Sequence, residues 1–295
     1  MGAPLLEDGR DCPWCICALG KFGGRELGFG SDVELLFVYE DEGTTSCDPS
    51  VPNSVYFADL VREFSRTIVV RREGIFEVDL RLRPYSNDGP LAVTVDGFNA
   101  YYSEEGNARQ FERLALVKLR PVAGDPELGA RVVECRDGYV YSGAGLDVEN
   151  ILHLRNRQAN ELVTPEAINA KYSPGGLVDV EYYVQALQIV VGNVDAAVRC
   201  TNTLDAIKQL VERGHLSRTR GEELEQTYGF LRQLIDALRA VRGHAKDLTI
   251  PDSDAPEFTY LARRLDFEST EALQDGIATS MGQAQNTWGQ GILSR

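Results

Sequence analysis

The sequence lacks long apolar runs and an excess of basic residues, and both absences exclude functions. No apolar run among its 295 residues approaches the roughly 20 that a membrane-spanning helix needs. The formal net charge of -15 argues against binding DNA or RNA, because that depends on clustered lysines and arginines. A small anion held through metal ions stays compatible with this charge, since the metals are positive. We expect no membrane span and no nucleic-acid partner.

The first ten residues, MGAPLLEDGR, lack the marks of targeting. They contain neither the basic region nor the apolar core of a secretory signal peptide. Leu6 stands where a myristoylation signal has Ser or Thr. We therefore expect a cytoplasmic location.

The sequence also has few residues for nucleophilic or zinc chemistry. Its three histidines all lie in the second half, so no Ser-His-Asp or Cys-His arrangement is indicated. Among six cysteines, Cys12 and Cys15 have the spacing of a redox pair or half a zinc site, but Cys47, Cys135 and Cys200 are scattered singly. A strand-like WCICAL follows where a thioredoxin-like pair would begin a helix. We predict reduced cysteines packed as small hydrophobic residues.

A glycine-rich stretch, GKFGGRELGFGSDVEL at residues 20–35, is the first positive signal. It does not match the G-x-G-x-x-G dinucleotide fingerprint, nor a Walker P-loop, because Phe22 follows Lys21. It is compatible with a strand that leads through a short helical turn into a second strand carrying Asp32 and Glu34. A plain turn between two strands remains the alternative.

The predicted secondary structure changes near residue 145. Before that point, strand-like runs at 33–39, 75–82 and 114–121 alternate with a helical pattern from Phe57 to Ile68. After it, helical spacing predicts helices over 177–191 and 224–243 and one opened by a capping box of Asp254 and Glu257. Thr164, followed by Pro165, indicates another helix start. We predict an α+β fold, a mixed sheet with helices followed by a helical bundle.

The acidic residues suggest a metal site. Asp32 and Glu34, two apart on a strand, point to the same face, and their mutual repulsion is offset when they bind divalent cations. The strand over 75–82 would place Asp79, Arg81 and Arg83 on one face, and Asp79 would complete a two-metal Mg²⁺ clamp for phosphoryl or nucleotidyl transfer. The upstream residues that would approach phosphates are Gly20, Lys21, Gly23, Gly24 and Ser31. An acidic pair on an exposed strand is the alternative.

Four blocks together make the chain recognisable: GKFGGRELGFGSDVELLFVY, FEVDLRLRPYSNDGPLAV, FERLALVKLRPVAGD and SPGGLVDVEYYVQALQ. Their order resembles the glutamine synthetase adenylyltransferase family of the DNA polymerase β-like nucleotidyltransferases. The resemblance implies a catalytic domain at residues 1–143 and a helical-bundle domain at 144–295. It also implies transfer of AMP from ATP to a tyrosine of glutamine synthetase, or its removal by phosphorolysis, with a PII-type signalling protein as a candidate partner.

The resemblance also assigns roles to residues. Asp32, Glu34 and Asp79 correspond to the metal-binding and catalytic carboxylates, and Gly20 and Lys21 to the phosphate-binding step. Side chains expected around the triphosphate or the acceptor, unless they form a solvated or salt-bridged basic face, are Arg81, Arg83, Lys118 and Arg120. The signature GGLVDVE matches through Gly175, Gly176, Asp179 and Glu181 and is expected to fix its helix against the catalytic domain.

The chain departs from the family at three points. Glu34 stands where the family usually has Asp, and Phe111 replaces the Trp of a Trp-Glu-Arg motif. The chain also has one Ser-Asp motif, at Ser31–Asp32, whereas the full-length family enzymes have two similar halves in tandem. We therefore expect either a relative with one catalytic half or a piece of a longer enzyme. Two alternatives stay open: nucleotidyl transfer to another acceptor, such as uridylylation of a signalling protein or a small molecule, and a catalytically weak nucleotide-sensing subunit.

Overall fold

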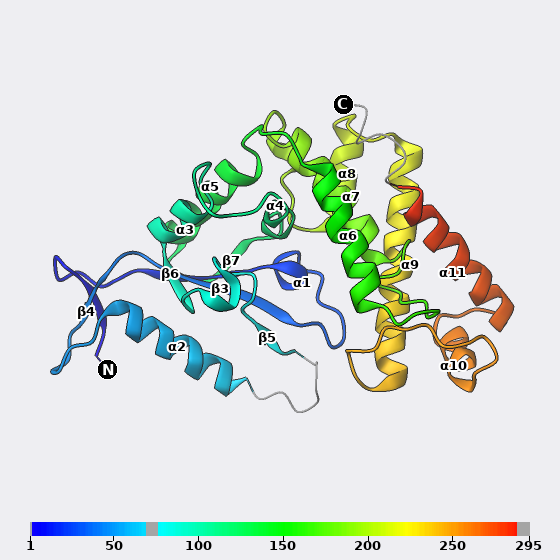
Figure 1. Ribbon diagram of the computed structural model, residues 1–295, viewed down its shortest axis with the longest axis horizontal. Helices are drawn as coiled ribbons and strands as arrows, with labels where there is room; N and C mark the ends of the chain where they lie inside the picture. Colours follow the sequence, from blue (N-terminus) through cyan, green and yellow to red (C-terminus); the bar gives the residue numbers. More distant parts are fainter. Residues whose placement is uncertain (1, 69–75, 288–295) are drawn as a thin grey trace. The chain divides into compact units, whose positions relative to one another are not determined.

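The computed structural model describes residues 2–68 and 76–287, which divide into two compact units. Residues 2–27, 32–68 and 76–142 form the first unit, and residues 28–31 and 143–287 form the second. The first unit combines helices with a mixed sheet and the second consists of helices and loops, so the chain is of the predicted α+β class (Figure 1). The short segment 28–31 belongs to the second unit although it lies within the glycine-rich stretch.

A five-stranded sheet organises the first unit. Its order is β5-β3-β2-β7, with β6 also paired to β3; β2 runs antiparallel to β3 and β7, while β5 and β6 run parallel to β3. The strands are β2 Trp14–Ala18, β3 Val33–Tyr39, β5 Val78–Asp79, β6 Ala92–Thr94 and β7 Arg120–Gly124, and β1 Pro4–Leu6 pairs with β4 Gly43–Thr45 in a separate ribbon. The predicted strand over 33–39 is confirmed as β3.

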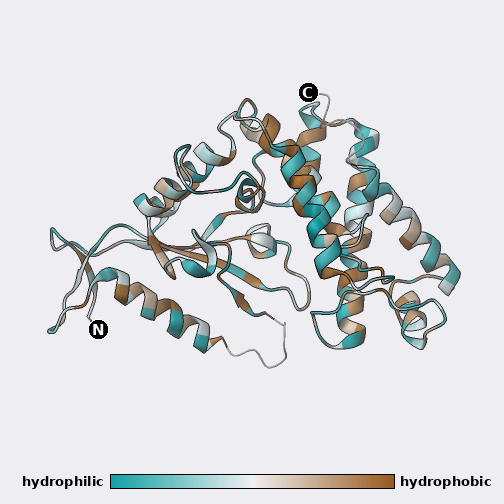
Figure 2. Cartoon of the chain, in the orientation of Figure 1, coloured by the Kyte–Doolittle hydropathy of each residue, from teal (hydrophilic) through white to brown (hydrophobic). Residues whose placement is uncertain are grey.

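The core of the first unit lies between the sheet and the helix α2 Asn53–Thr67. Leu35, Phe37 and Tyr39 alternate along β3 and face Phe57 and Val61, and the Tyr39 and Phe57 rings stack with centroids 4.5 Å apart. Figure 2 shows hydrophobic colour along the strands of this sheet. The helix predicted from the spacing at 57–68 is therefore confirmed.

The cysteines at the start of the chain contribute to the same unit. Cys12, Cys15 and Cys17 are buried and carry free thiols, as predicted. Burial raises the pKa of the Cys12 thiol, which keeps it protonated and unreactive. The other helices of this unit are α1 Gly20–Gly23, α3 Val95–Tyr101, α4 Glu112–Leu116 and α5 Pro126–Val140, with a 3-10 turn η1 at Ser86–Asp88.

Two predicted strands are wrong in extent. Of the run 75–82, only Val78–Asp79 forms a strand, and Ile75 lies outside the described residues. The reason is that β3 offers one edge to two partners: Val33 and Glu34 pair with β5, while Phe37–Tyr39 pair with β6. The charged alternation of this run therefore belongs mostly to a turn and not to a strand face.

The run 114–121 is also not a single strand. Its first residues end the helix α4, and β7 begins at Arg120 and passes through Pro121. Proline fits there because β7 lies at the edge of the sheet and the register with β2 shifts between Ile16 and Cys17. Lys118 consequently lies in a connection and shares no strand face with Arg120.

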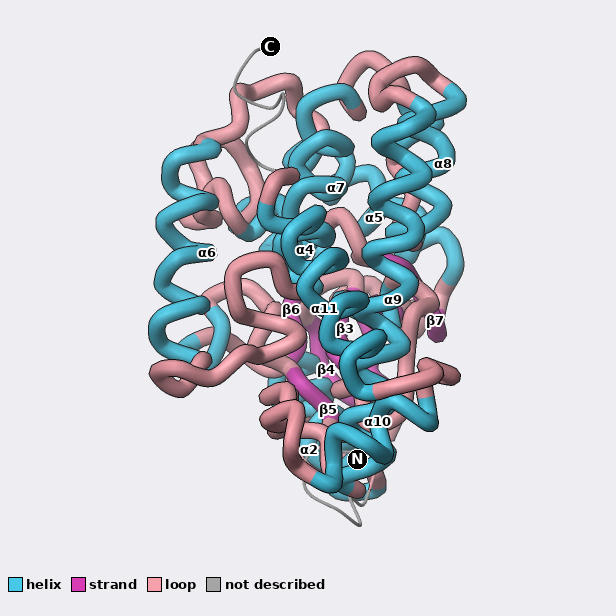
Figure 3. The backbone as a smooth tube through the Cα atoms, turned by 90° about the vertical axis from the view of Figure 1, so that its right-hand side faces the viewer, coloured by secondary structure: helices cyan, strands magenta, loops and turns pink. Residues whose placement is uncertain are grey.

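The second unit is built from six helices among its described residues: α6 Val148–Leu162, α7 Leu177–Val191, α8 Thr203–Glu212, α9 Arg218–Arg242, α10 Pro256–Arg264 and α11 Thr270–Gln285, with a 3-10 turn η2 at Ala196–Val198. Helix α9 contacts α7, α8, α10 and α11, and loops join the helices (Figure 3). The helices predicted over 177–191 and 224–243 are confirmed, and α9 ends before Gly243 in a left-handed conformation. No helix in the described part of the chain is long and apolar enough to cross a bilayer.

One predicted helix start is wrong, and the helix predicted near Asp254 is confirmed as α10 but without its capping box. Thr164–Glu166 forms a turn, in which Glu166 has a positive φ of 66° and Ala167 donates its N–H to the Thr164 carbonyl. Asp254 does not cap α10, which begins at Pro256 after Ala255. Glu257, the expected partner in that capping box, instead accepts a 2.6 Å hydrogen bond from Arg242 Nε.

The signature GGLVDVE fixes its helix within the second unit. Asp179, buried at the start of α7, accepts hydrogen bonds from Arg155 Nε at 2.5 Å and from the Gly175 N–H at 2.6 Å. Gly175 has a φ of 82°, and a Cβ there would lie 2.2 Å from the Met281 carbonyl oxygen. Glu181 is also buried. The signature therefore joins α6, α7 and α11.

Candidate active site

Two predicted site carboxylates are brought together by strand pairing. In the parallel register of β3 and β5, Glu34 lies directly opposite Asp79. Paired residues of neighbouring strands project to the same face of a sheet, so both side chains share a face. Asp32 immediately precedes β3, two residues from Glu34, and is exposed. The sheet thus gathers the backbone positions of all three carboxylates at one edge.

Asp79 is held by the arginine two residues later. Arg81 donates hydrogen bonds to both carboxylate oxygens, the shortest being 2.6 Å from Nη2 to Oδ2. Burial raises the pKa of the Asp79 carboxyl, but the hydrogen bonds from Arg81 outweigh it, and the net pKa is lowered. The Arg81 side chain is 69% exposed and the Asp79 side chain is 14% exposed. The pair therefore lies at the surface, and the Asp79 carboxylate is more buried than the Arg81 guanidinium.

Glu34 occupies the space that a side chain at residue 20 would need. Gly20 begins α1 with a φ of 48°, and a Cβ built there would lie 2.5 Å from the Glu34 carboxylate. Both the left-handed backbone and the nearby carboxylate thus require glycine. This contact joins the glycine-rich turn to the carboxylate edge.

The two predicted lysines converge on a glutamate that the sequence analysis missed. Lys118 Nζ forms an ion pair with Glu26, and both side chains are 5% exposed. Lys21 Nζ lies 3.8 Å from the same Glu26 carboxylate, with a side chain 15% exposed. Glu26 therefore neutralises a buried cluster of positive charge, which favours the salt-bridged alternative for Lys118.

Arg120 and the next two glycines hold α1 against the sheet. Arg120 donates to the Gly23 and Phe22 carbonyls, each at 2.9 Å. A Cβ at Gly23 would lie 1.9 Å from the Lys118 carbonyl oxygen, so only glycine allows this approach. Gly24 follows α1 and donates its N–H to the Gly20 carbonyl. Arg120 is thus bound to the turn itself.

Arg83 is buried within its own loop. It is 7% exposed and donates to the carbonyls of Leu80 at 2.6 Å, Pro90 at 3.0 Å and Gly89 at 3.4 Å. The expectation that Arg83 shares a strand face with Asp79 and Arg81 is wrong, because the chain leaves the strand after Asp79. The guanidinium orders the turn that follows β5.

Ser31 belongs to the second unit together with its partner on α9. Arg239 Nη1 donates to the Phe29 carbonyl at 3.0 Å and lies 3.3 Å from Ser31 Oγ, which also accepts from the Gly28 N–H at 3.1 Å. Ser31 is 3% exposed. The residue directly before Asp32 is therefore fixed by a helix some 200 residues away in sequence, a role no local pattern could have shown.

The carboxylates suit a divalent metal in chemistry and in strand register. Oxygen ligands from a few carboxylates are what Mg²⁺ prefers, and Gly20 leaves the space in which Glu34 lies. Within residues 2–68 and 76–287, however, no three His, Cys, Asp or Glu side chains are close enough together to hold one metal ion. Asp79 is turned toward Arg81.

Comparisons with known proteins match both parts of the chain. Residues 1–135 match the family described as glutamate-ammonia ligase adenylyltransferase, and residues 148–287 match the family described as PII-uridylyltransferase. The first match contains all of the predicted site residues. The second covers the helices α6–α11.

Curated relatives align with most of the chain but extend well beyond it. A bifunctional glutamine synthetase adenylyltransferase/adenylyl-removing enzyme of Xanthomonas campestris pv. campestris (strain B100) is 32% identical over 94% of this chain and 30% of that protein. Enzymes of the same name from Streptomyces coelicolor and Nitrosococcus oceani are 35% and 34% identical over 86% and 82% of this chain, each aligned over 26% of its own length. The chain therefore spans less than a third of these relatives. Residues 1–135 thus match the glutamate-ammonia ligase adenylyltransferase family, and most of the chain aligns with part of the enzymes that carry the related name.

Proposed function

We propose that this chain is a nucleotidyltransferase that moves AMP between ATP and a tyrosine hydroxyl of glutamine synthetase, attaching it or removing it by phosphorolysis. The observation that carries the proposal is the strand pairing of Glu34 with Asp79. Glu34 lies two residues after Asp32, and all three carboxylates lie within the region that matches the family. The names of the aligned relatives supply the acceptor and the nucleotide.

Attachment forms a bond between the phenol oxygen and the α-phosphorus of ATP while the bond to pyrophosphate breaks. Removal forms the bond from inorganic phosphate to the same phosphorus, so AMP leaves as part of ADP and the tyrosine oxygen takes a proton. Asp79 is ionised and is suited to orient the phenol hydroxyl by accepting its hydrogen bond during attachment, while the phenol proton is lost to water. Catalysis would then rest mainly on positioning and charge neutralisation.

Asp32, Glu34 and Asp79 would hold Mg²⁺, and Arg81 would have to release Asp79 on metal binding. Bound Mg²⁺ would neutralise phosphate charge and lower the pKa of the acceptor. Gly20, Lys21, Gly23, Gly24 and Ser31 would border the phosphates. Arg81 is the arginine best placed to meet the nucleotide or the acceptor, since Arg83 and Arg120 donate to nearby carbonyls.

The proposal includes a polymerase β-like nucleotidyltransferase domain at 1–143 and a helical-bundle domain at 144–295. The antiparallel β2 and β3, joined through α1 and followed by the parallel β5, support it. A cytoplasmic location goes with the use of ATP and glutamine synthetase.

The intact mass of glutamine synthetase tests the proposal, after incubation with this protein, ATP and Mg²⁺. We expect a gain of one AMP per subunit, or loss of AMP from modified enzyme when phosphate replaces ATP. Asp32→Asn should abolish either change, because it removes a metal-binding charge. Asp254→Asn, an exposed aspartate ahead of α10, is the matched control and should leave the reaction intact. An unchanged mass in both directions would contradict the proposal and favour the nucleotide-sensing alternative.

A second candidate keeps the chemistry and changes the acceptor. Residues 148–287 match the PII-uridylyltransferase family, which favours UMP transfer from UTP to a PII-type signalling protein. The same mass measurement with UTP and a PII protein separates the two, since only one pair of nucleotide and acceptor should react. A PII protein that alters AMP transfer without gaining mass would instead be a regulatory partner.

A further inference from the structure

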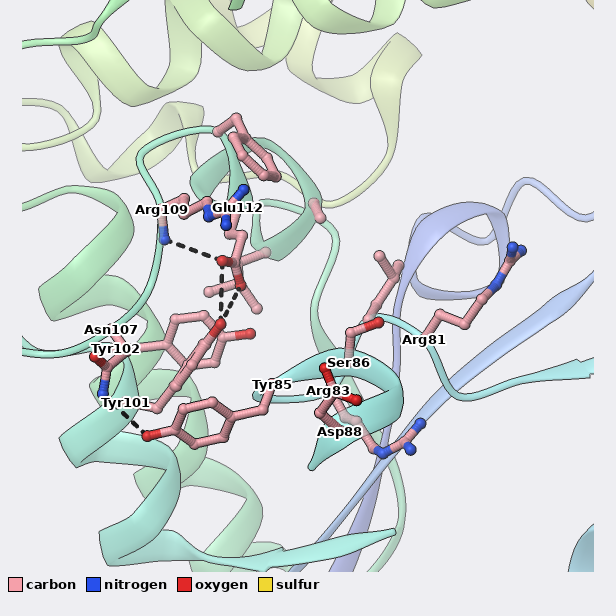
Figure 4. A pocket seen from close by; sticks show the side chains of 14 residues that line it. Arg81, Arg83, Tyr85, Ser86, Asp88, Tyr101, Tyr102, Asn107, Arg109 and Glu112 are labelled. Carbon is pink, nitrogen blue, oxygen red and sulfur yellow. Dashed lines mark hydrogen bonds between the residues drawn. The ribbon is translucent and has the colours of Figure 1, made fainter. Parts of the chain in front are cut away.

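A cavity of about 520 Å³ lies in the first unit, between the turn after β5 and the helices α3 and α4. Its wall includes Arg81, Tyr85, Tyr101, Tyr102, Arg109 and Glu112 (Figure 4). This volume is within the range of small-molecule sites, about 300–1,000 Å³. We call it the tyrosine-lined cavity.

Tyr85 offers an aromatic face that is fixed but half exposed. Its backbone is left-handed with a φ of 59°, an unfavourable conformation for a bulky residue. Its ring packs against Tyr101 with centroids 4.6 Å apart, and its hydroxyl accepts a 3.0 Å hydrogen bond from Asn107 Nδ2. The side chain nevertheless remains 50% exposed. An aromatic ring held in this way is preorganised to stack on another ring.

The neighbouring polar groups are also fixed. Glu112 accepts from the Tyr101 hydroxyl at 3.1 Å and from the Arg109 N–H at 3.0 Å. Burial raises the pKa of the Tyr101 and Tyr102 phenols, so both remain neutral donors at physiological pH. The cavity therefore presents neutral aromatic rings, with the Arg109 main chain anchored beside them.

Arg81 joins this cavity to the carboxylate edge. It lines the cavity and at the same time donates to both oxygens of Asp79. In Figure 4 it lies at the side opposite the paired rings of Tyr85 and Tyr101. A ligand in the cavity therefore lies beside Arg81, the hydrogen-bond partner of Asp79, with the rings of Tyr85 and Tyr101 on the other side.

We propose that the tyrosine-lined cavity receives the acceptor tyrosine, free or as its AMP diester, with the ring against Tyr85 and the phenol oxygen toward the edge where Arg81 holds Asp79. The ring would gain an aromatic contact and the diester phosphate a guanidinium partner. The inference rests on the proposed function and names the subsite for the acceptor. An adenine base would also stack on Tyr85, so the test must separate the two.

The test compares Tyr85→Ala and Tyr85→Phe with Tyr260→Ala, a control tyrosine of similar exposure on α10. We expect Tyr85→Ala to raise KM for glutamine synthetase about threefold to tenfold, the effect of losing one aromatic contact. KM for ATP should stay unchanged. Tyr85→Phe keeps the ring and should retain most of the acceptor affinity, and Tyr260→Ala should match the original protein. Equal melting temperatures would exclude a folding defect.

A rise in KM for ATP alone would overturn the proposal by assigning the cavity to the nucleotide, and so would unchanged constants for both substrates.

If the original protein modifies no glutamine synthetase, the proposed function fails and the cavity is tested by binding. The probe is a fluorescent peptide with one phosphotyrosine, which carries the modified ring and a phosphate but no adenine, compared with the same peptide carrying phenylalanine. Binding of the modified peptide that weakens in Tyr85→Ala but not in Tyr260→Ala supports the cavity. Binding insensitive to Tyr85→Ala, or no binding, overturns it.

Discussion

Charged side chains are buried around α1, whereas some are exposed at the edge formed by Asp32 and β5. Around α1, the Glu26 and Lys118 side chains are 5% exposed and pair with each other. At the edge, Asp32 is exposed and the Arg81 side chain is 69% exposed. Buried charges depend on their protein partners, whereas exposed charges are exchanged easily for water, metal or ligand. We therefore expect changes to the buried ion pair to have their largest effect on stability and changes at the edge to have theirs on activity.

Glu26→Gln should show the largest loss of stability. Removing one partner of a buried ion pair leaves the other charge uncompensated, at a cost of about 3–5 kcal/mol in the free energy of unfolding. Urea unfolding would measure it, with Glu63→Gln as control, because Glu63 pairs with Arg66 at the surface of α2. Equal effects of the two substitutions would contradict the comparison. The double variant Glu26→Leu/Lys118→Met should recover part of the loss.

Gly23→Ala should follow, because the new methyl group would collide with the Lys118 carbonyl oxygen, 1.9 Å from an ideal Cβ. Overpacking of this kind costs about 1–3 kcal/mol. Gly138→Ala on α5 is the control: nothing lies within 4 Å of its Cβ position, and alanine should stabilise that helix by up to about 1 kcal/mol. Thermal unfolding of both variants should therefore shift in opposite directions. A shift in the same direction would show that α1 has room to move.

Arg239→Met tests whether the segment before Asp32 depends on its hydrogen bonds to α9. It removes the hydrogen bonds to the Phe29 carbonyl and Ser31, worth about 1.5 kcal/mol for a charged donor. We expect faster hydrogen exchange over residues 28–32 and a lower kcat, since Asp32 follows Ser31 directly. Arg218→Met, at the exposed start of α9, should change neither. Normal kcat with faster exchange would show that the edge is independent of this segment.

Arg81→Met should change stability least and pH dependence most clearly. The pKa of Asp79 is lowered in the folded protein, so its contribution to stability is present above its unfolded pKa and is lost as pH falls through the folded pKa. Without Arg81, burial should raise the pKa of Asp79, and the acid limb of the rate profile should move to higher pH. Carboxyl NMR titration checks the pKa directly, with Arg131→Met, which breaks an exposed pair with Glu40, as control. An unmoved Asp79 titration would contradict this assignment of the pair.

Local patterns in the sequence were enough to predict the continuous elements. The β-branched and aromatic run at 33–39 forms β3, and helical spacing correctly placed α2, α7 and α9. Asp32 and Glu34 were predicted as a pair from their spacing of two, and their role in binding metal stays a prediction. The predictions of β3, α2, α7 and α9 succeed because strand and helix periodicities arise from the backbone itself. The end of α9 before Gly243 was predictable for a separate reason: glycine readily adopts the left-handed conformation that follows the last helical residue.

Where several elements compete for one partner, the sequence was insufficient. The alternation at 75–82 predicts a long strand, but β6 occupies the part of β3 that such a strand would need. Lys118 and Arg120 have similar local surroundings in sequence, yet one pairs with Glu26 and the other with the carbonyls of α1. Arg239 carries no local signal, because its partner Ser31 is 208 residues away, and Lys118, the buried partner of Glu26, is 92 residues away.

The sequence by itself predicted the α+β class, the resemblance to the adenylyltransferase family and the carboxylates that we propose as metal ligands. Only the tertiary structure decided which charged residues are committed to the fold and which remain at the exposed edge. The physical reason is that local periodicity records which face a side chain takes, while burial and ion pairing depend on partners supplied by the rest of the chain. The tyrosine-lined cavity is a result of the same kind, since its walls come from segments that meet only in the folded unit.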